Sequence, residues 1–206
     1  MLDWFESGGP LMYVIAAGGV FGALLFFERL LHLHRAQINP RTFLQGIYTN
    51  LKRDNVLEAV TLCEETPGPV ARIAQAAILH REEPAPDLRR AVEDAGRAEI
   101  PRLEQHIVIL ATLARVLPLI GLTGTILGLI ETLSIMNANA PLVHSGDLTG
   151  GMAEALMTTA AGLIAAIPLA IAYHVLIGRV ESLLADMEAA AIDVTGFLAH
   201  ADRHAE

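Results

Sequence analysis

Hydroxyl and carboxyl side chains interrupt two apolar stretches of this chain, and such groups can carry protons or ions through a membrane. The stretches are PLIGLTGTILGLIETLSIM (118–136) and AEALMTTAAGLIAAIPLAIAYHVLI (153–177), within a run of 63 residues without Lys or Arg between Arg115 and Arg179. Each is long enough to cross the hydrocarbon of a bilayer. Because polar groups at membrane depth are costly, their presence suggests that something is moved across the membrane.

Each stretch places its threonines and small residues on one helical face. The first face holds, at spacings of four, three and four residues, Gly121, Thr125, Gly128 and Thr132. The second holds Ala155, Thr159, Gly162 and Ala166, with Thr158 next to Thr159. Such faces from several copies could line a narrow polar path with hydroxyls and water. A Thr hydroxyl can also bond back to its own helix, so one Thr alone does not indicate a pore.

Glycines and prolines in these stretches also have a structural interpretation. Small residues let two helices approach closely, and this alone could account for the glycines on or beside the two faces, Gly121, Gly124, Gly128 and Gly162. Pro118 and Pro168 each free a backbone carbonyl one turn earlier, which favours a hinge or a hydrated site.

Three charged side chains border or enter the stretches. Glu131 lies five to six residues from one end, roughly 8 Å deep at 1.5 Å per residue. A carboxylate at that depth needs a partner or a hydrated cavity, although it could equally lie in water at the mouth of a pore. Glu154 and Arg115 lie near the ends of their stretches and could be interfacial anchors, and Glu154 also suits a helix N-terminus.

A third apolar block precedes these two and runs from Pro10 to Phe27 without a charge. It reaches the length of a span when residues 30–33 and an Arg29 that snorkels to the interface are added. We therefore predict an all-α polytopic membrane protein with three transmembrane helices, the second and third extending into the cytoplasm. The predicted segments are an external N-terminus and first helix (1–33), a cytoplasmic helical insert (34–106), the second helix (107–137), an external loop (138–151), the third helix (152–179) and a cytoplasmic C-terminal helix (180–206).

Basic residues predict the orientation. Ten of the fourteen Lys and Arg residues lie between His34 and Gln105, whereas the N-terminus and the 137–152 connection hold none. Because basic loops stay in the cytoplasm, we expect the insert and the C-terminus to be cytoplasmic and the N-terminus to face out.

The insert is expected to be helical. NVLEAVTLCEE and PVARIAQAAILH have apolar residues at helical spacing, and TPGP (66–69) and REEPAPD (81–87) are breaks. From Asp87 we expect one long helix that feeds the second span, with Pro101 as a place for a kink. After Arg179 the amphipathic pattern predicts that the third span continues as a helix.

Composition argues against several classes of function. The chain has 206 residues, 53% of them hydrophobic, and its net charge of −9 makes nucleic-acid binding unexpected. Its mean hydropathy is +0.46. Cys63 is the only cysteine, so no intrachain disulfide or thiol metal cluster is expected, and no cofactor site is seen. No nucleophile–base pair or phosphate loop supports an enzyme, and no basic residue precedes the first block as in a secretory signal.

ATLARVLPLIGLTGTILGLIETL and the following GGMAEALMTTAAGLIAAIPLAIAYHVL resemble the MotA/TolQ/ExbB proton channel family, and most closely its ExbB and TolQ branch. The family segments P-x-x-G-L-x-G-T-V-x-G and G-I-x-E-A-L-x-x-T-A-x-G-L-x-x-A-I-P correspond to 118–128 and 151–168. MotA-type stators usually have four spans and a longer chain, which argues against that branch. Two departures are Arg115, where the family usually has a small residue, and Glu131, where it usually has a neutral one.

The resemblance implies a bacterial inner-membrane motor stator: a homopentamer around a pore occupied by single-span helices of an ExbD- or TolR-like partner. The partner's membrane Asp carries the proton, and a TonB- or TolA-like protein receives the work. Thr125 and Thr159 match the family's pore-lining threonines, and Glu154 matches its motif glutamate. With Thr158, these form the expected proton pathway, while Glu131 and Arg115 receive no role by analogy.

Two other interpretations stay open. A non-conducting membrane scaffold would use the small-residue faces for packing alone. A sodium-driven stator would need further hydroxyls or carboxylates near the ion path, and Glu131 leaves that open. The process that is energised, whether TonB-type uptake, Tol-type envelope maintenance or another motor task, is not decided by these residues.

Overall fold

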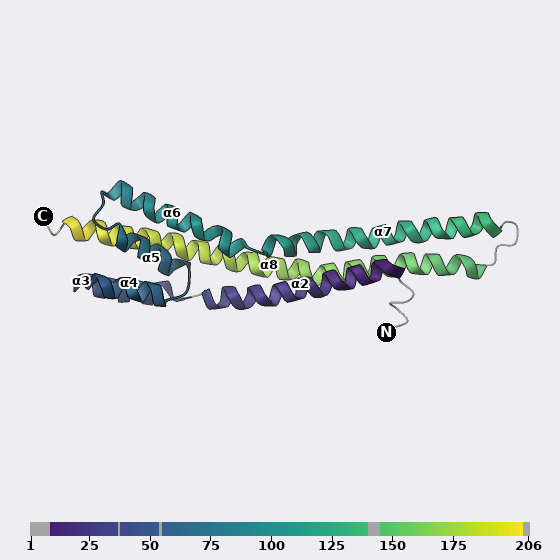
Figure 1. Cartoon of the computed structure of the whole chain (residues 1–206), viewed down its shortest axis with the longest axis horizontal. Coiled ribbons are helices and arrows are strands. Elements are labelled where there is room, and N and C mark those ends of the chain that lie inside the picture. Colours follow the sequence, from purple (N-terminus) through teal and green to yellow (C-terminus); the bar gives the residue numbers. More distant parts are fainter. Residues whose placement is uncertain (1–8, 37, 54, 140–144, 204–206) are drawn as a thin grey trace. The chain divides into compact units, whose positions relative to one another are not determined.

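A computed structural model gives the backbone of residues 9–36, 38–53, 55–139 and 145–203, and their side chains except at 138–139, 145–148 and 199–203. The described residues form helices and contain no strand. The helices are α2 (Gly9–Ala36), α3 (Pro40–Lys52), α4 (Val56–Glu65), α5 (Pro69–Leu79), α6 (Ala85–Glu104), α7 (Ile107–Asn139) and α8 (Ser145–Arg203) (Figure 1). The prediction of an all-α fold is confirmed.

The chain divides into two compact units. We call Met1–Arg29 with His106–Leu176 the apolar unit, and Leu30–Gln105 with Ile177–Glu206 the charged unit. Among the residues that the structure describes, three helical stretches are long and apolar enough to cross a membrane, and they lie within Gly9–Lys52, Ala85–Asn137 and Thr149–Leu198. This confirms the predicted number of spans.

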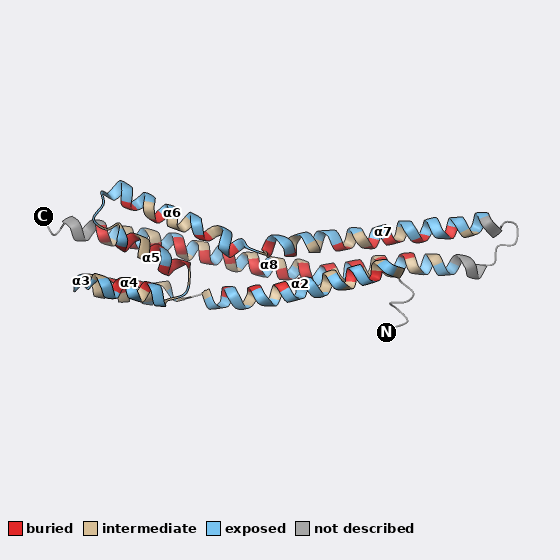
Figure 2. Ribbon diagram, in the orientation of Figure 1, coloured by how far each residue is buried: buried red, intermediate tan, exposed pale blue. Residues whose placement is uncertain are grey.

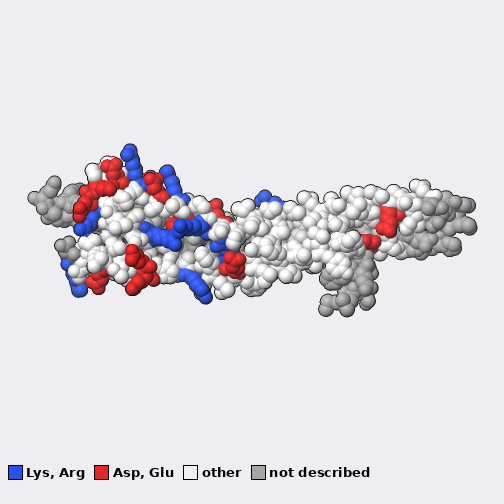
Figure 3. Space-filling view, viewed as in Figure 1, with Lys and Arg blue, Asp and Glu red and all other residues white. Residues whose placement is uncertain are grey.

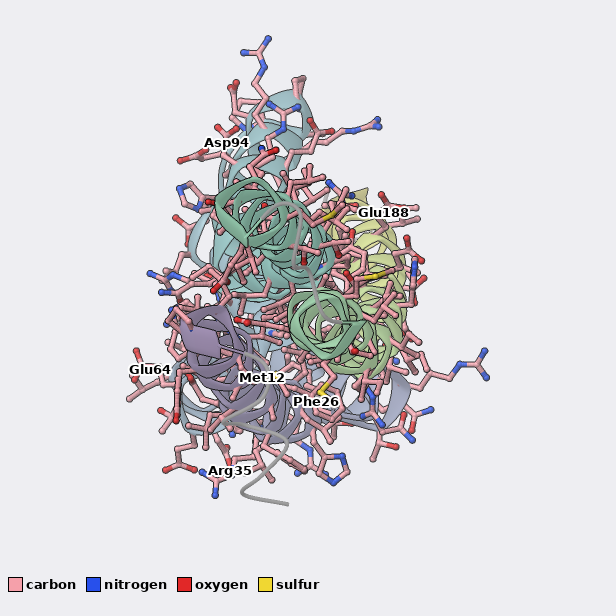
Figure 4. The ribbon with its side chains drawn as sticks, turned by 90° about the vertical axis from the view of Figure 1, so that its right-hand side faces the viewer. Met12, Phe26, Arg35, Glu64, Asp94 and Glu188 are labelled. Carbon is pink, nitrogen blue, oxygen red and sulfur yellow. The ribbon has the colours of Figure 1, made fainter. Side chains whose placement is uncertain are left out.

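The apolar unit contains α7 and the first parts of α2 and α8. Viewed end-on, the three ribbons lie at the corners of a triangle (Figure 4). Gly19 on α2 faces the Ala165 methyl of α8, and Gly22 faces the Leu169 side chain. Much of the outer surface of these helices is exposed (Figure 2), and it carries large apolar side chains such as Phe27, Leu122 and Ile164. This is the surface expected of helices that face lipid or neighbouring spans.

The charged unit packs like a water-soluble helical domain. Consecutive helices α3 to α6 contact one another, and their apolar faces bury residues such as Ile47 and Ile73. The residues of α8 beyond Ile177 also contribute buried side chains, among them Val194. Ionised side chains cover the surface of this unit, whereas the visible face of the apolar unit has few (Figure 3).

Helix boundaries in the charged unit follow local sequence signals. The breaks at TPGP and REEPAPD separate α4, α5 and α6, as predicted. Helix α3 was not among the predicted helices, although its start carries a strong signal. The Asn39 side chain accepts a hydrogen bond from the Thr42 N–H at 3.4 Å, and Pro40 occupies the first turn, where its missing N–H is not needed.

The expectation of one continuous helix from Asp87 into the second span is wrong. α6 ends at Glu104 and α7 begins at Ile107, because Gln105 has an extended ψ of 137° and His106 has a φ of 64°. Pro101 lies inside α6 and lacks the N–H that would bond one turn back, which weakens the end of that helix. The third span does continue without interruption, since α8 runs past Arg179 to Arg203.

Arg29 does not snorkel as predicted. Its residue is 3% exposed, and its Nε and Nη2 atoms are buried without a hydrogen-bond partner among the described residues. The guanidinium therefore lies inside the fold at the end of the first apolar block.

Candidate functional site

The two small-residue faces meet where α7 packs against α8. Around Gly121 the two backbones are so close that an added Cβ would lie 2.9 Å from the Thr158 carbonyl oxygen and 3.1 Å from the Thr159 Cα. At Gly128 it would lie 2.7 Å from the Gly151 carbonyl oxygen, and at Gly162 it would lie 2.8 Å from that of Leu117. Any side chain here would push the helices apart, so glycine makes the close approach possible.

Thr125 and Thr159 lie at this contact and bridge the two helices. The Thr125 hydroxyl lies 3.1 Å from the Ala155 carbonyl oxygen on α8, and the Thr159 hydroxyl lies 3.1 Å from the Gly121 carbonyl oxygen on α7. The two hydroxyls also contact each other directly. Both residues are half-buried. The pairing depends on two residues 34 positions apart, and the sequence pattern alone placed each of them only on its own helix.

The hydroxyl pair has more acceptors than hydrogens. Each Thr hydroxyl has one hydrogen and two lone pairs, whereas the Gly121 and Ala155 carbonyls and the opposite hydroxyl are all within reach. Either hydroxyl can therefore donate to a carbonyl while the other donates to it. Such a group can reorient its hydrogens without breaking the helix contact, which is what a polar step in a proton path requires.

Thr158 and Thr132 have a different environment. Thr158 is 2% exposed, and its hydroxyl bonds to its own helix at the Ala155 and Glu154 carbonyls, at 3.0 and 3.1 Å. Its side chain packs opposite Gly124 of α7. Thr132 is 5% exposed and bonds to the Gly128 carbonyl at 2.8 Å. In the single chain these two residues fill space opposite glycine rather than present a hydroxyl to water.

Glu131 and Glu154, which the sequence treated separately, line the same cavity of about 190 Å³. The cavity also involves Thr158 and the start of α2 at Pro10 and Leu11. An added Cβ on Gly9 would collide with the Glu154 carboxylate. A carboxylate in a span requires a partner or a cavity that water can enter, and this cavity provides such a space beside both carboxylates. Nothing in the residue spacing pointed to this meeting, because it depends on how α2, α7 and α8 pack.

Similarity to known proteins identifies the family of this chain. The pattern of the MotA/TolQ/ExbB proton channel family matches residues 65–189, which include both apolar stretches and the whole α7–α8 contact. The chain belongs to the MotA/TolQ/ExbB proton channel family.

Its relatives lie in the ExbB and TolQ branch. An ExbB homologue from Methanothermobacter thermautotrophicus, named a biopolymer transport protein, is 26% identical over 182 residues, which are 88% of this chain and 64% of that protein. The biopolymer transport protein ExbB of Neisseria gonorrhoeae is 26% identical over 213 residues, covering 92% of this chain and 93% of the relative. The Tol-Pal system protein TolQ of Haemophilus influenzae is 40% identical over 97 residues, 47% and 42% of the two chains. The chain thus spans just under two thirds of the first relative's length.

The remaining sequence-predicted residues lie apart from the hydroxyl pair. In this member of the ExbB and TolQ branch, the exposed Arg115 has no ion pair with any described residue. Pro118 and Pro168 lie inside α7 and α8, which both continue through them. Among the described residues, no group of three or more His, Cys, Asp or Glu side chains is placed to hold a metal ion. Together with the three spans, the family makes the chain a multi-pass membrane protein.

Proposed function

We propose that this chain is the ring-forming subunit of a proton channel that converts proton motive force into mechanical work in the bacterial inner membrane. The observation that carries the proposal is the Thr125–Thr159 hydroxyl pair at the α7–α8 contact. It is a polar step inside a largely apolar helix pair, at the positions that match the family's pore-lining threonines. Membership of the family supports conduction of protons rather than another solute.

The ring is a homopentamer around a pore occupied by single-span helices of an ExbD- or TolR-like partner. The exposed apolar faces of α7 and α8 supply surfaces for neighbouring copies and lipid. The titrating carboxylate belongs to the partner's membrane Asp, because neither apolar stretch of this chain contains an Asp. A TonB- or TolA-like protein then receives the work, and the relatives named for biopolymer transport and the Tol-Pal system support either process.

The proton path runs from outside to the cytoplasm. A proton enters past the Glu131–Glu154 cavity, protonates the partner's Asp, and leaves past Thr125 and Thr159. Neutralising the Asp removes the cost of its charge against the apolar wall and lets the partner helices turn within the ring. The available drive is about 2.3 kcal/mol per charge per 100 mV, to which the pH gradient adds. The N-terminus is periplasmic and the insert and C-terminus are cytoplasmic, as the basic residues favour.

Proton flux in liposomes that contain this chain and its single-span partner tests the proposal. Thr125→Val and Thr159→Val keep the side-chain shape and remove the hydroxyl, so both should abolish proton flux while assembly persists. Thr123→Val is the matched control, because the exposed Thr123 hydroxyl bonds only to Leu119 of its own helix, at 2.9 Å. Undiminished flux in the first two variants would rule out the pathway.

A non-conducting scaffold is the second candidate, since every threonine hydroxyl at the α7–α8 contact reaches a protein acceptor in the single chain. In such a scaffold the hydroxyls only hold the two helices together through hydrogen bonds. Liposomes that contain the wild-type chain and its partner would then show no proton flux above that of empty liposomes. A sodium-driven stator is favoured only by the shared Glu131–Glu154 cavity. It predicts that replacing sodium by potassium at constant pH stops the work.

A further inference from the structure

The charged unit contains a basic cavity where α2 ends. The cavity has a volume of about 490 Å³ and lies between the end of α2, the start of α5 and the last turns of α6. Its charged lining consists of Arg35, Arg72, Arg102, Glu99 and His32, the last carrying charge only when protonated. Neither the helix packing nor the proposed proton path uses it.

Two guanidinium groups, those of Arg72 and Arg102, share one carboxylate in this cavity, and Arg35 lines it as a third basic residue. The Glu99 side chain is 11% exposed and accepts hydrogen bonds from Arg72 at 2.6 Å and from Arg102 at 3.2 Å. Both arginines remain more than half exposed, at 51% and 64%. Arg35 forms no ion pair with any described residue, and its side chain extends away from the α2 ribbon (Figure 4). The cavity therefore keeps an excess of two positive charges even with His32 neutral.

The backbone at the cavity adds a weaker effect of the same sign. α5 begins at Pro69, and its N-terminal residue Gly68 makes no side-chain capping bond. The positive end of an uncapped helix favours an anion. The end of α2 opposes this, because the Ala36 carbonyl lies beside Gly68. The guanidinium groups, rather than the helix ends, decide the sign of the potential.

The position along α2 indicates where the anion comes from. Phe27 is the last residue of the uncharged block, and Arg35 follows it eight residues later on the same helix, roughly 12 Å along the axis. This places His32 in the last turn of the first span and Arg35 just past its end, at the depth of lipid phosphates. Basic pockets at such positions bind the headgroups of anionic phospholipids.

We propose that this cavity binds the phosphate headgroup of an anionic phospholipid. Arg35 approaches the phosphate from the membrane side, while Arg72 and Arg102 hold it from the opposite wall, oriented by Glu99. The site does not depend on whether the chain conducts protons, so loss of flux and loss of lipid binding are separate outcomes.

Binding to the purified full chain in neutral detergent tests the site. The probes are short-chain phosphatidylglycerol, short-chain phosphatidylcholine and inorganic phosphate, with the retained lipid counted by native mass spectrometry over a titration. Wild-type protein should retain phosphatidylglycerol in preference to phosphatidylcholine. Arg35→Gln should weaken phosphatidylglycerol binding roughly fivefold, the equivalent of about 1 kcal/mol for one basic residue at an anionic surface. Arg89→Gln removes the same charge from an exposed position of α6 outside the cavity and should change nothing.

Glu99→Gln gives an effect of the opposite sign. It removes the negative charge and keeps groups that can bond Arg72 and Arg102, so phosphatidylglycerol should bind more tightly. Because Glu99 is largely buried, the thermal stability of Glu99→Gln is measured first. If Glu99→Gln does not fold, the comparison of Arg35→Gln with Arg89→Gln alone tests the proposal.

Three results would overturn the assignment. Equal retention of phosphatidylglycerol by Arg35→Gln and Arg89→Gln would mean that the cavity is not the site. Competition by inorganic phosphate at equal concentration would identify a soluble phosphate rather than a lipid as the ligand. If the single-span partner co-purified with the wild-type chain but not with Arg35→Gln, and lipid retention were unchanged, the cavity would hold a protein segment instead.

Discussion

The apolar and charged units are both helical, but they hold their helices together by opposite means. In the charged unit large side chains fill the interior, as Ile73 and Val92 do at 1% and 2% exposure. At the α7–α8 contact of the apolar unit, glycine and threonine occupy the interior. Many leucine and isoleucine side chains, such as Leu122 and Ile164, face outward, although Leu117 and Leu169 are buried against α2. Water drives large apolar groups inward, whereas lipid gives them no such preference and leaves close backbone packing as the attraction.

Polar groups follow the same division. Six ion pairs between described residues lie in the charged unit. In the apolar unit His106 lies 3.6 Å from the Glu28 carboxylate, a contact that is an ion pair only when His106 is protonated. In the apolar unit the threonine hydroxyls bond to backbone carbonyls instead. An uncharged hydroxyl costs far less to bury in a span than an ion, so it is the polar group that a helix pair can keep there.

The largest expected effect comes from emptying the interior of the charged unit. Ile73→Ala should destabilise this unit by about 2–5 kcal/mol, because it leaves a cavity in a packed core. Hydrogen exchange of the α5 amides in the full chain measures it, since the two units need not unfold together. Leu57→Ala is the control, as Leu57 is 82% exposed. Equal loss of protection in both variants would contradict the soluble-like core.

The converse change in the apolar unit adds volume rather than removes it. Gly121→Ala places a methyl group 2.9 Å from a backbone carbonyl and should cost about 1–3 kcal/mol. Gly178→Ala, on α8 with no atom within 4 Å, should instead stabilise by up to about 1 kcal/mol through helix propensity. Unfolding in mixed micelles monitored by circular dichroism compares the two. If Gly121→Ala stabilised the chain as Gly178→Ala does, α7 and α8 would not be in close contact at Gly121.

The threonine pair sharpens the comparison at the level of single hydrogen bonds. Thr125→Val and Thr159→Val should each cost about 1 kcal/mol. The double variant should cost less than the sum by at least about 0.5 kcal/mol, because the hydroxyls share partners. The same micelle unfolding assay gives all three values. If the costs of the two single variants added up to that of the double variant, the two hydroxyls would not interact.

The smallest expected effect is an alkaline loss of stability confined to the charged unit. Burial, with a smaller contribution from Glu64, raises the pKa of the Cys63 thiol from 9.0 to about 11. The folded state disfavours the thiolate, so this contribution to stability is complete below pH 9 and is lost as the pH rises toward 11. Maleimide labelling of the folded chain should stay slow at pH 8 and accelerate toward pH 11. Cys63→Ala should flatten the alkaline decline, and rapid labelling at pH 8 would contradict the burial.

The hydropathy pattern and the helix-breaking segments were enough to predict much of the fold. Three apolar blocks predicted three spans, and TPGP and REEPAPD predicted where α4, α5 and α6 separate, because these signals act within a few residues of chain. The break at Gln105 and His106 was not predicted, since neither residue is a typical helix breaker and the helix is interrupted only by the ψ of 137° at Gln105 and the φ of 64° at His106. The burial of Arg29 was not predicted either, because the expectation of snorkelling treats the helix in isolation and ignores the side chains packed against it.

The residues of the candidate site were predicted better than their arrangement. Thr125, Thr159 and the glycines stood out because a 3.6-residue period places them on one side of each helix. Their cross-helix acceptors, the Gly121 and Ala155 carbonyls, were not visible because every residue has a carbonyl and only packing selects two of them. Periodicity also grouped Thr158 with Thr159, although its own hydroxyl turns back to α8.

The sequence by itself determined that this chain is helical, crosses a membrane three times and carries hydroxyls on small-residue faces. These properties follow from the order of apolar, small and charged residues, which acts locally. Only the tertiary structure decided that Thr125 meets Thr159, that Glu131 shares a cavity with Glu154, and that Arg72 and Arg102 share Glu99 in a cavity that Arg35 also lines. Such meetings join residues far apart in the chain, and their geometry depends on how closely the helix backbones approach.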